Sequence, residues 1–71
     1  MKMEPVESSN LKAIGYDEEA GILRVAFKSG PSYNYKGVPL SAYESLLMSD
    51  SKGACFALTI KGHYEYEKVK E

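Results

Sequence analysis

Hydrophobic side chains alternate with polar or small ones in the first half of the chain, which is the pattern of β-strands with one buried face. The alternation is clearest at residues 22–28, and shorter alternating segments at residues 10–16 and 32–36 predict two more strands. The polar run at residues 17–21 ends in glycine, as a hairpin loop does. Because the connections are short, the three strands are expected to form an antiparallel meander.

The spacing of hydrophobic residues becomes helical in the second half of the chain. Ser41 and Glu44 match a capping box, in which each side chain bonds a backbone N–H group of the other residue. Tyr43 and Leu47 lie four residues apart, as on the apolar stripe of a helix. A helix is therefore expected over residues 41–49.

Residues 52–62 fit two patterns. Phe56, Leu58 and Ile60 alternate as in a strand, but Phe56 and Ile60 are also four residues apart, as in a helix. A serine before the segment, two alanines within it and Gly62 at its end favour a helix that is closed by a glycine cap.

These elements predict an α+β fold: a three-stranded antiparallel β-meander followed by two short helices packed on one face, in the order βββαα. Residues 63–67 alternate aromatic and polar side chains, which predicts a short extended C-terminal tail. The length allows a single domain. We place it at residues 6–69, between a flexible N-terminus at residues 1–5 and a frayed C-terminus at residues 70–71.

Composition and charge restrict the kinds of partner. The formal net charge of −1 excludes a polycation that binds nucleic acid over its whole surface, but residues 28–63 carry four lysines against two carboxylates, enough for a local basic patch. Cys55 is the only cysteine, so no intrachain disulfide can form. The sequence shows no signal peptide and no apolar run long enough to span a bilayer. We expect a cytoplasmic protein without membrane or metal partners and without a cofactor.

Tyr33 and Tyr35 share one face of the third strand, because successive side chains of a strand alternate. If Leu23 and Val25 of the neighbouring strand line the core, the two tyrosines are their cross-strand partners and pack against the helices. On an open face, the same rings would stack on the bases of single-stranded nucleic acid, with Lys36 beside them. The sequence leaves both interpretations open.

Two other groups of residues suggest binding. Lys52 and Gly53 stand at the start of the second helix, where free N–H groups can hold an anion, although the glycine could instead allow close packing between helices. A polar and aromatic cluster near the C-terminus is the second choice of surface, and it consists of Lys61, His63, Tyr64 and Tyr66.

No catalytic machinery is evident in the sequence. Cys55 and His63 could be proposed as a nucleophile and its base, but no third residue is available to orient the imidazole. One cysteine and one histidine also do not make a four-ligand zinc site. We therefore expect a protein that is not an enzyme.

A series of short motifs runs in a fixed order along the chain, from Ser8-Ser9-Asn10 and Ile14-Gly15-Tyr16, through Tyr33-Asn34-Tyr35 and Ser51-Lys52-Gly53, to the segment Ile60 to Tyr66. With these motifs, residues 6–69 resemble the KTSC domain, a bacterial and phage family with a central Y-x-Y motif that also occurs at the C-terminus of some lysyl-tRNA synthetases. The resemblance implies a small α+β fold, and the synthetase context suggests RNA binding. Ala57, Leu58 and Thr59 depart from a more basic family pattern, which weakens that suggestion.

Our leading hypothesis is a small non-catalytic binding module for RNA or a nucleotide-like anion, which uses the tyrosines of the third strand with Lys36, Lys52 and Lys61. The alternative is a protein-interaction or self-association module of bacterial or phage origin, which uses an exposed sheet edge or an aromatic patch.

Overall fold

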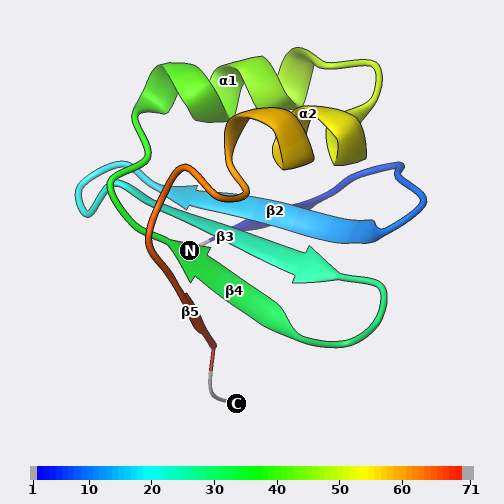
Figure 1. The fold of residues 1–71 in the computed structure, drawn as a ribbon, viewed down its shortest axis with the longest axis horizontal. Helices are drawn as coiled ribbons and strands as arrows, with labels where there is room; N and C mark the ends of the chain where they lie inside the picture. The colour runs from blue at the N-terminus through cyan, green and yellow to red at the C-terminus, as the bar shows by residue number, and fades with distance from the viewer. Residues whose placement is uncertain (1, 70–71) are drawn as a thin grey trace.

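A computed structural model describes residues 2–69 of the chain, in which an antiparallel sheet is covered on one face by two helices (Figure 1). This confirms the α+β class and the two helices. The elements are β1 (Met3–Pro5), β2 (Leu11–Asp17), β3 (Ile22–Phe27), β4 (Ser32–Tyr35), α1 (Leu40–Met48), α2 (Lys52–Thr59) and β5 (Tyr66–Lys68).

The sheet has five strands in the order β1-β2-β3-β4-β5, so the predicted βββαα arrangement is wrong in its strand count. The central meander β2-β3-β4 is as expected, but a short strand is added at each edge. Strand β1 lies in the segment expected to be a flexible N-terminus, and β5 lies in the expected extended tail. Each has only three residues, too few to show an alternating pattern in the sequence. The expectation for residues 70–71 falls outside the described residues.

Backbone hydrogen bonds extend the pairing of the edge strands beyond their three residues. The N–H group of Lys36 donates to the carbonyl of Glu65 and that of Val69 donates to Ser32, both at 2.8 Å, one at each end of β5. On the other edge, the N–H group of Val6 donates to Lys12 at 3.2 Å. Both edge strands are therefore held by main-chain bonds, which depend little on the identity of the side chains.

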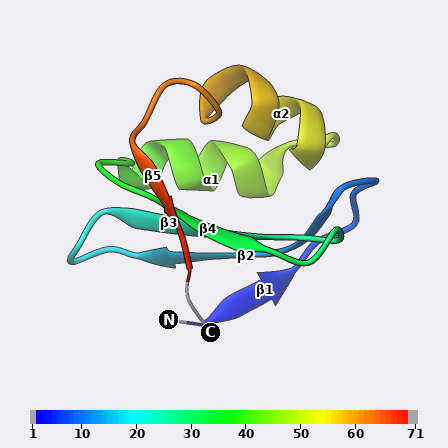
Figure 2. The same ribbon diagram turned by 60° about the horizontal axis from the view of Figure 1, so that its bottom comes forward.

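The two helices lie on the same side of the sheet, as Figure 2 shows. Because Leu23 pairs with Tyr35, and Val25 with Tyr33, these four side chains share the helix-covered face. Their neighbours in sequence point to the other face, which we call the outer face. It carries Gly15, Arg24, Asn34 and Glu67 in one row across the sheet, and Ala13, Ala26 and Ser32 in the next.

Strand β2 contains a bulge between Leu11 and Ala13. Leu11 and Ile14 are both fully buried although they are three residues apart, which a regular strand does not allow. The extra residue, Lys12, restores the alternation so that Leu11 and Ile14 reach the same core.

Helix α1 begins differently from the prediction. Its N-cap is Pro39 rather than Ser41, and no side chain caps the first turn, so the predicted capping box is wrong. The fixed φ angle of proline favours this entry into the helix. Helix α2 confirms the helical interpretation of residues 52–62, but it ends at Thr59, with Ile60 rather than Gly62 as C-cap.

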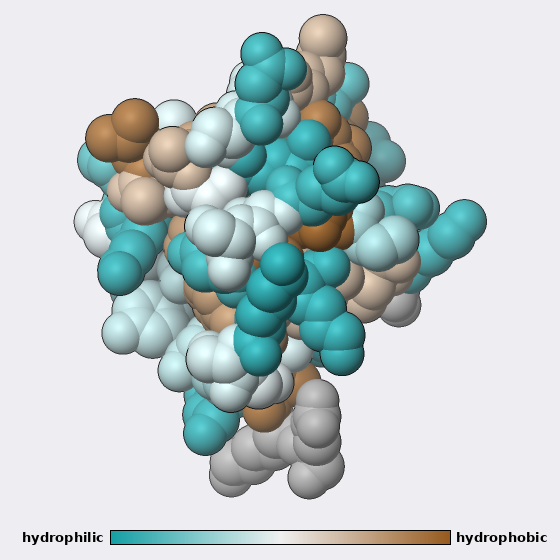
Figure 3. Space-filling model, turned by 90° about the vertical axis from the view of Figure 1, so that its right-hand side faces the viewer, coloured by the Kyte–Doolittle hydropathy of each residue, from teal (hydrophilic) through white to brown (hydrophobic). Residues whose placement is uncertain are grey.

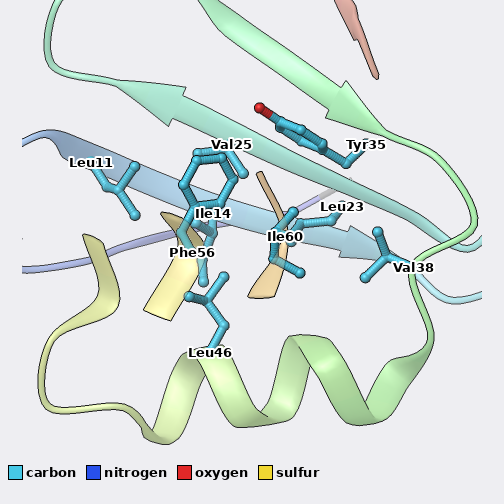
Figure 4. Close-up of a cluster of buried hydrophobic side chains, with 9 residues drawn as sticks. All are labelled: Leu11, Ile14, Leu23, Val25, Tyr35, Val38, Leu46, Phe56 and Ile60. Carbon is cyan, nitrogen blue, oxygen red and sulfur yellow. The ribbon is translucent and has the colours of Figure 1, made fainter. Parts of the chain in front are cut away.

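Nine side chains form the core between the two layers (Figure 4). Leu46 reaches from α1 toward the sheet, and Phe56 and Ile60 approach from α2. The remaining members come from the sheet and from the loop that follows β4, namely Leu11, Ile14, Leu23, Val25, Tyr35 and Val38. Within residues 2–69, no helix has the length and apolar character needed to cross a membrane.

Candidate functional site

A hollow with a volume of about 360 Å³ lies beside α2 on the helix-covered face of the sheet. We call it the aromatic hollow, because five of its ten lining residues are aromatic. The lining residues are Asn10, Phe27, Ser29, Pro31, Tyr33, Tyr35, Phe56, Ala57, Lys61 and Tyr66. The size falls within the range of roughly 300–1,000 Å³ that is usual for small-molecule sites.

The aromatic rings of the hollow touch one another in a continuous series. Tyr33 meets Tyr66 edge to face with ring centroids 5.7 Å apart, and Phe27 meets Tyr33 in the same way at 5.7 Å. The ring centroid of Tyr35 lies 5.3 Å from that of Phe56 and 5.4 Å from that of Tyr66. Such contacts hold aromatic rings in fixed orientations and supply flat apolar surfaces with hydroxyl groups at their edges.

The two central tyrosines differ in exposure. Tyr35 is only 5% exposed, which confirms that it packs in the core as a cross-strand partner of Leu23. Tyr33 is half-buried, and Tyr66 at the sheet edge is 61% exposed. The packing and surface interpretations of the Y-x-Y motif therefore describe different parts of one aromatic group: Tyr35 belongs to the core, whereas Tyr33 and Tyr66 reach the surface.

The environment of Tyr35 keeps its hydroxyl group neutral. Burial raises the pKa of Tyr35 above its ordinary value of 10.0, and the neighbouring hydroxyl groups of Tyr66 and Tyr33 raise it further. The phenol thus remains a hydrogen-bond donor and acceptor at any physiological pH.

Among residues 2–69, Lys61 is the one charged residue that lines the hollow. Its backbone N–H group donates to Phe56 at 2.9 Å, which places the lysine in the turn directly after α2. Lys68 pairs with Tyr33 in the β4–β5 ladder and therefore lies on the same face of the sheet as the tyrosine. Glu67, in contrast, pairs with Asn34 and faces the outer side.

Several predicted site residues lie elsewhere. Lys36 forms an ion pair with Glu67, at 3.7 Å between Nζ and Oε2, and does not line the hollow. Lys52 donates to the backbone carbonyl of Ser49 at 3.0 Å. His63 is exposed in the turn after α2, and Tyr64 is half-buried against the core. Of the nine predicted residues, the hollow brings together Tyr33, Tyr35, Lys61 and Tyr66.

The start of α2 is closed by the β1–β2 connection. A β-carbon on Gly53 would stand 2.6 Å from Oδ1 of Asn10 and 3.0 Å from Oγ of Ser8. Gly53 therefore packs closely against the side-chain ends of a loop, rather than against the other helix as the sequence suggested. Side-chain oxygens of Asn10 and Ser8 lie beside this helix end.

Sequence reasoning missed six lining residues of the hollow. Phe27 could have been predicted from the sequence, because the alternation of β3 places it on the same side as the buried Leu23 and Val25. Phe56 could have been included once residues 52–62 were taken as a helix. The other four, Asn10, Ser29, Pro31 and Ala57, come mostly from loops, and no pattern in the sequence shows that these segments meet.

Cys55 and His63, which were considered as a nucleophile and its base, lie in α2 and in the turn after it. Cys55 is half-buried in α2, and its sulfur lies 3.8 Å from Oγ1 of Thr59. Within residues 2–69 no three histidine, cysteine, aspartate or glutamate residues are grouped so that they could hold a metal ion.

Comparisons with known proteins agree with this fold. The model of the KTSC domain matches residues 7–69. A solved structure of a KTSC domain protein from Yersinia pestis superposes with a TM-score of 0.92 at 36% identity, and covers 97% of both chains. An uncharacterised protein from Stutzerimonas stutzeri is 41% identical over 70 residues, which is 97% of this chain and 99% of that protein.

Part of a larger enzyme is also similar. A lysine–tRNA ligase from Nostoc sp. is 40% identical over 63 residues, which is 89% of this chain but only 11% of the ligase. The similarity thus concerns one segment of the ligase. The family model, the solved structure and the relatives together show that this chain belongs to the KTSC domain family.

Proposed function

We propose that the domain is a non-catalytic binding module that holds one nucleotide, either free or within single-stranded RNA, in the aromatic hollow. The observation that carries the proposal is the meeting of Tyr33 and Tyr66 with Lys61 around one hollow of about 360 Å³. A nucleotide combines a flat aromatic base with a phosphate, and the hollow combines aromatic surfaces with a cation.

The base would lie against the exposed ring of Tyr66 and the half-buried ring of Tyr33. Stacking on aromatic side chains contributes roughly 1–3 kcal/mol per base in single-strand binders and tolerates any base, because every base has a π face. Tyr35 and Phe56 would form the floor. Since both are buried in the core, the floor is rigid and the ligand does not have to order it.

The phosphate would lie toward Lys61. Lys68 supports a positive rim because it shares the face of Tyr33, whereas Glu67 is directed away and paired with Lys36. A local arrangement of this kind is compatible with the formal net charge of −1, because binding depends on the charges near the phosphate. Lys36 and Lys52 are not part of this proposal, in contrast to the hypothesis from sequence.

The ligase relatives give independent support. By its name a lysine–tRNA ligase acts on tRNA, and a segment of the Nostoc protein is 40% identical to this chain. A module that binds unpaired nucleotides would be useful in such an enzyme and would also function alone.

The proposal is tested by fluorescence anisotropy with three labelled probes: a six-nucleotide single-stranded RNA, an RNA duplex and a mononucleotide. We expect the single strand or the mononucleotide to bind and the duplex to bind more weakly, because paired bases cannot enter the hollow. The logarithm of the affinity should fall with the logarithm of salt concentration with a slope of about −0.7 per phosphate contacted. Absence of binding to all three probes would contradict the proposal.

A second candidate function, self-association, is favoured by exposed apolar side chains of the two helices. Met48 is 85% exposed and Leu58 is 75% exposed. On the face drawn in Figure 3, hydrophobic residues occur as separate spots among hydrophilic ones. Multi-angle light scattering distinguishes the two functions: a dimer that Met48→Lys and Leu58→Lys dissociate would favour self-association, and a monomer would exclude it.

A further inference from the structure

Asn10 is one of the residues that line the aromatic hollow, and it is exposed to solvent. The residue belongs to the connection between β1 and β2, and its backbone carbonyl accepts a hydrogen bond from Lys28 at 2.9 Å. The connection is therefore anchored to the end of β3, and the side chain of Asn10 has a fixed starting point.

The hydroxyl group of Ser8 determines which way the amide of Asn10 is turned. Oγ of Ser8 accepts from the backbone N–H groups of Asn10 and Leu11, at 3.4 Å each, so both of its lone pairs are in use. Its single hydrogen is then free to donate, and it donates to Oδ1 of Asn10 at 3.0 Å. If the amide of Asn10 were rotated by half a turn, its NH₂ group would face Oγ of Ser8, and both lone pairs of that oxygen already accept hydrogen bonds.

The backbone of α2 closes the space on the carbonyl side of this amide. Oδ1 lies 2.6 Å from the position that a β-carbon on Gly53 would take. Oδ1 is thus occupied by Ser8 on one side and packed against the helix on the other. The polar group that Asn10 can offer to a ligand is its amide nitrogen, for which no hydrogen bond is found within residues 2–69.

Two of the polar groups that line the hollow are donors only. The NH₂ group of Asn10 and the ammonium group of Lys61 can only donate, whereas the hydroxyl groups of Ser29 and the tyrosines can donate or accept. A ligand that matches them presents acceptors. A carbonyl oxygen at the position of the base that meets Asn10 satisfies the amide nitrogen, but an exocyclic amino group at the same position places two donors against each other.

We propose that Asn10, positioned by Ser8, selects bases by the group on one recognised edge, at C4 of a pyrimidine or C6 of a purine. It prefers uracil and guanine, which carry a carbonyl group at that position, over cytosine and adenine, which carry an amino group there. This inference rests on the proposed function, since it names which nucleotides the same hollow prefers. Where the bound base shields the amide from water, a donor left unsatisfied changes the affinity about tenfold.

The experiment compares probes that differ only at the recognised edge. Six-nucleotide strands of uridine and cytidine form one pair, and strands of inosine and adenosine form the other. We expect the wild-type protein to bind each carbonyl-bearing strand about tenfold more tightly than its amino-bearing counterpart. Equal affinities within both pairs would overturn the inference and leave the proposed function standing, whereas no binding to any strand would overturn the proposed function itself.

Variants assign the preference to the amide. Asn10→Asp replaces the donor by an acceptor of the same shape, and the Ser8 hydroxyl can still donate to it. The ratio of uridine to cytidine affinity should fall to one or below. Because both strands carry the same phosphates, the added negative charge cancels in the ratio. Ser8→Ala should reduce the ratio with a smaller loss of total affinity, and Ser9→Ala should leave it unchanged. An unchanged ratio in Asn10→Asp would overturn the assignment to this residue.

The source of the nucleotide is distinguished by competition. Uridine and cytidine monophosphate are added to the complex with the labelled uridine strand. If uridine monophosphate displaces the labelled strand at about the same concentration as the unlabelled uridine strand does, the site binds a free nucleotide. Displacement only at much higher concentration indicates an RNA site that uses neighbouring phosphates. Displacement by both monophosphates at equal concentrations would contradict carbonyl selection.

Discussion

The side-chain oxygen of Asn10 lies 2.6 Å from the point where a β-carbon on Gly53 would stand, so the glycine lets the loop before β2 pack closely against the first turn of α2. The contact joins the N-terminal half of the chain to the second helix. It also holds in place one wall of the aromatic hollow, to which Asn10 contributes.

Gly53→Ala should change the stability of the domain by less than about 1 kcal/mol. Alanine normally stabilises a helix relative to glycine by up to about 1 kcal/mol, and the need to move the side-chain ends of Asn10 and Ser8 offsets part of that gain. Urea denaturation followed by circular dichroism measures the difference. A loss of about 2 kcal/mol or more would show that the loop cannot move aside.

The double variant Asn10→Ala with Gly53→Ala provides the control for this contact. Removal of the Asn10 amide opens the space that the new methyl group needs, so the double variant should be more stable than the sum of the two single changes indicates. Strict additivity would show that the two residues do not interact.

Tyr66→Ala should weaken nucleotide binding about tenfold, in line with the roughly 1–3 kcal/mol that one stacked base contributes. The effect on stability should be small, since the ring is 61% exposed on a three-residue edge strand. Tyr66→Phe retains the ring and should bind nearly as the wild type. Anisotropy and thermal melting, measured on the same samples, separate the two effects; a normal affinity for Tyr66→Ala would exclude stacking on this ring.

Lys61→Gln and Lys36→Gln form a matched pair, because each removes one exposed positive charge and only Lys61 lines the hollow. Lys61→Gln should lower the affinity for single-stranded RNA and reduce the magnitude of the salt slope by about 0.7, the value of one phosphate contact. Lys36→Gln should change neither, and the loss of its exposed ion pair with Glu67 should cost little stability. Equal effects of the two variants would indicate general attraction by charge.

The stability of the domain should decrease at alkaline pH through Tyr35. Because the folded protein raises the pKa of this phenol above 10.0, the folded state favours the neutral form. The corresponding stability is fully present below pH 10 and is lost as the pH rises through the raised pKa. Tyr35→Phe should therefore show a shallower loss of unfolding free energy above pH 10. Tyr43→Phe should act separately in the same direction, since burial and then Glu4 raise the pKa of Tyr43.

The sequence predicted the parts of the fold that repeat a regular pattern over several residues. The central meander follows from alternation in β3 and β4, and the first helix follows from its helical spacing. The second helix was favoured by the serine before it, the alanines within it and the glycine after it, because spacing alone also fitted a strand. The edge strands were missed because three residues form no pattern and their pairing depends on main-chain groups. The capping box was predicted from Ser41 and Glu44, but Pro39 ends the preceding extended segment and starts the helix two residues earlier.

The candidate site was predictable only where it coincides with strand periodicity. The shared face of Tyr33 and Tyr35 follows from their spacing, and the pairing with Val25 and Leu23 was anticipated from the meander. The contribution of Asn10 to the hollow was not anticipated, because it depends on the packing of a loop against α2. The burial of Tyr35 and the pairing of Lys36 also depend on elements that are distant in sequence.

The central claim, that the aromatic hollow is the binding surface, is tested most directly by NMR titration of the ¹⁵N-labelled protein with a single-stranded uridine oligonucleotide. We predict that the largest chemical-shift changes occur at Asn10, Tyr33, Lys61 and Tyr66, whereas the amides of Ala26 and Asn34 on the outer face stay nearly unchanged. Changes centred on the outer face, or none at saturating oligonucleotide, would contradict the account.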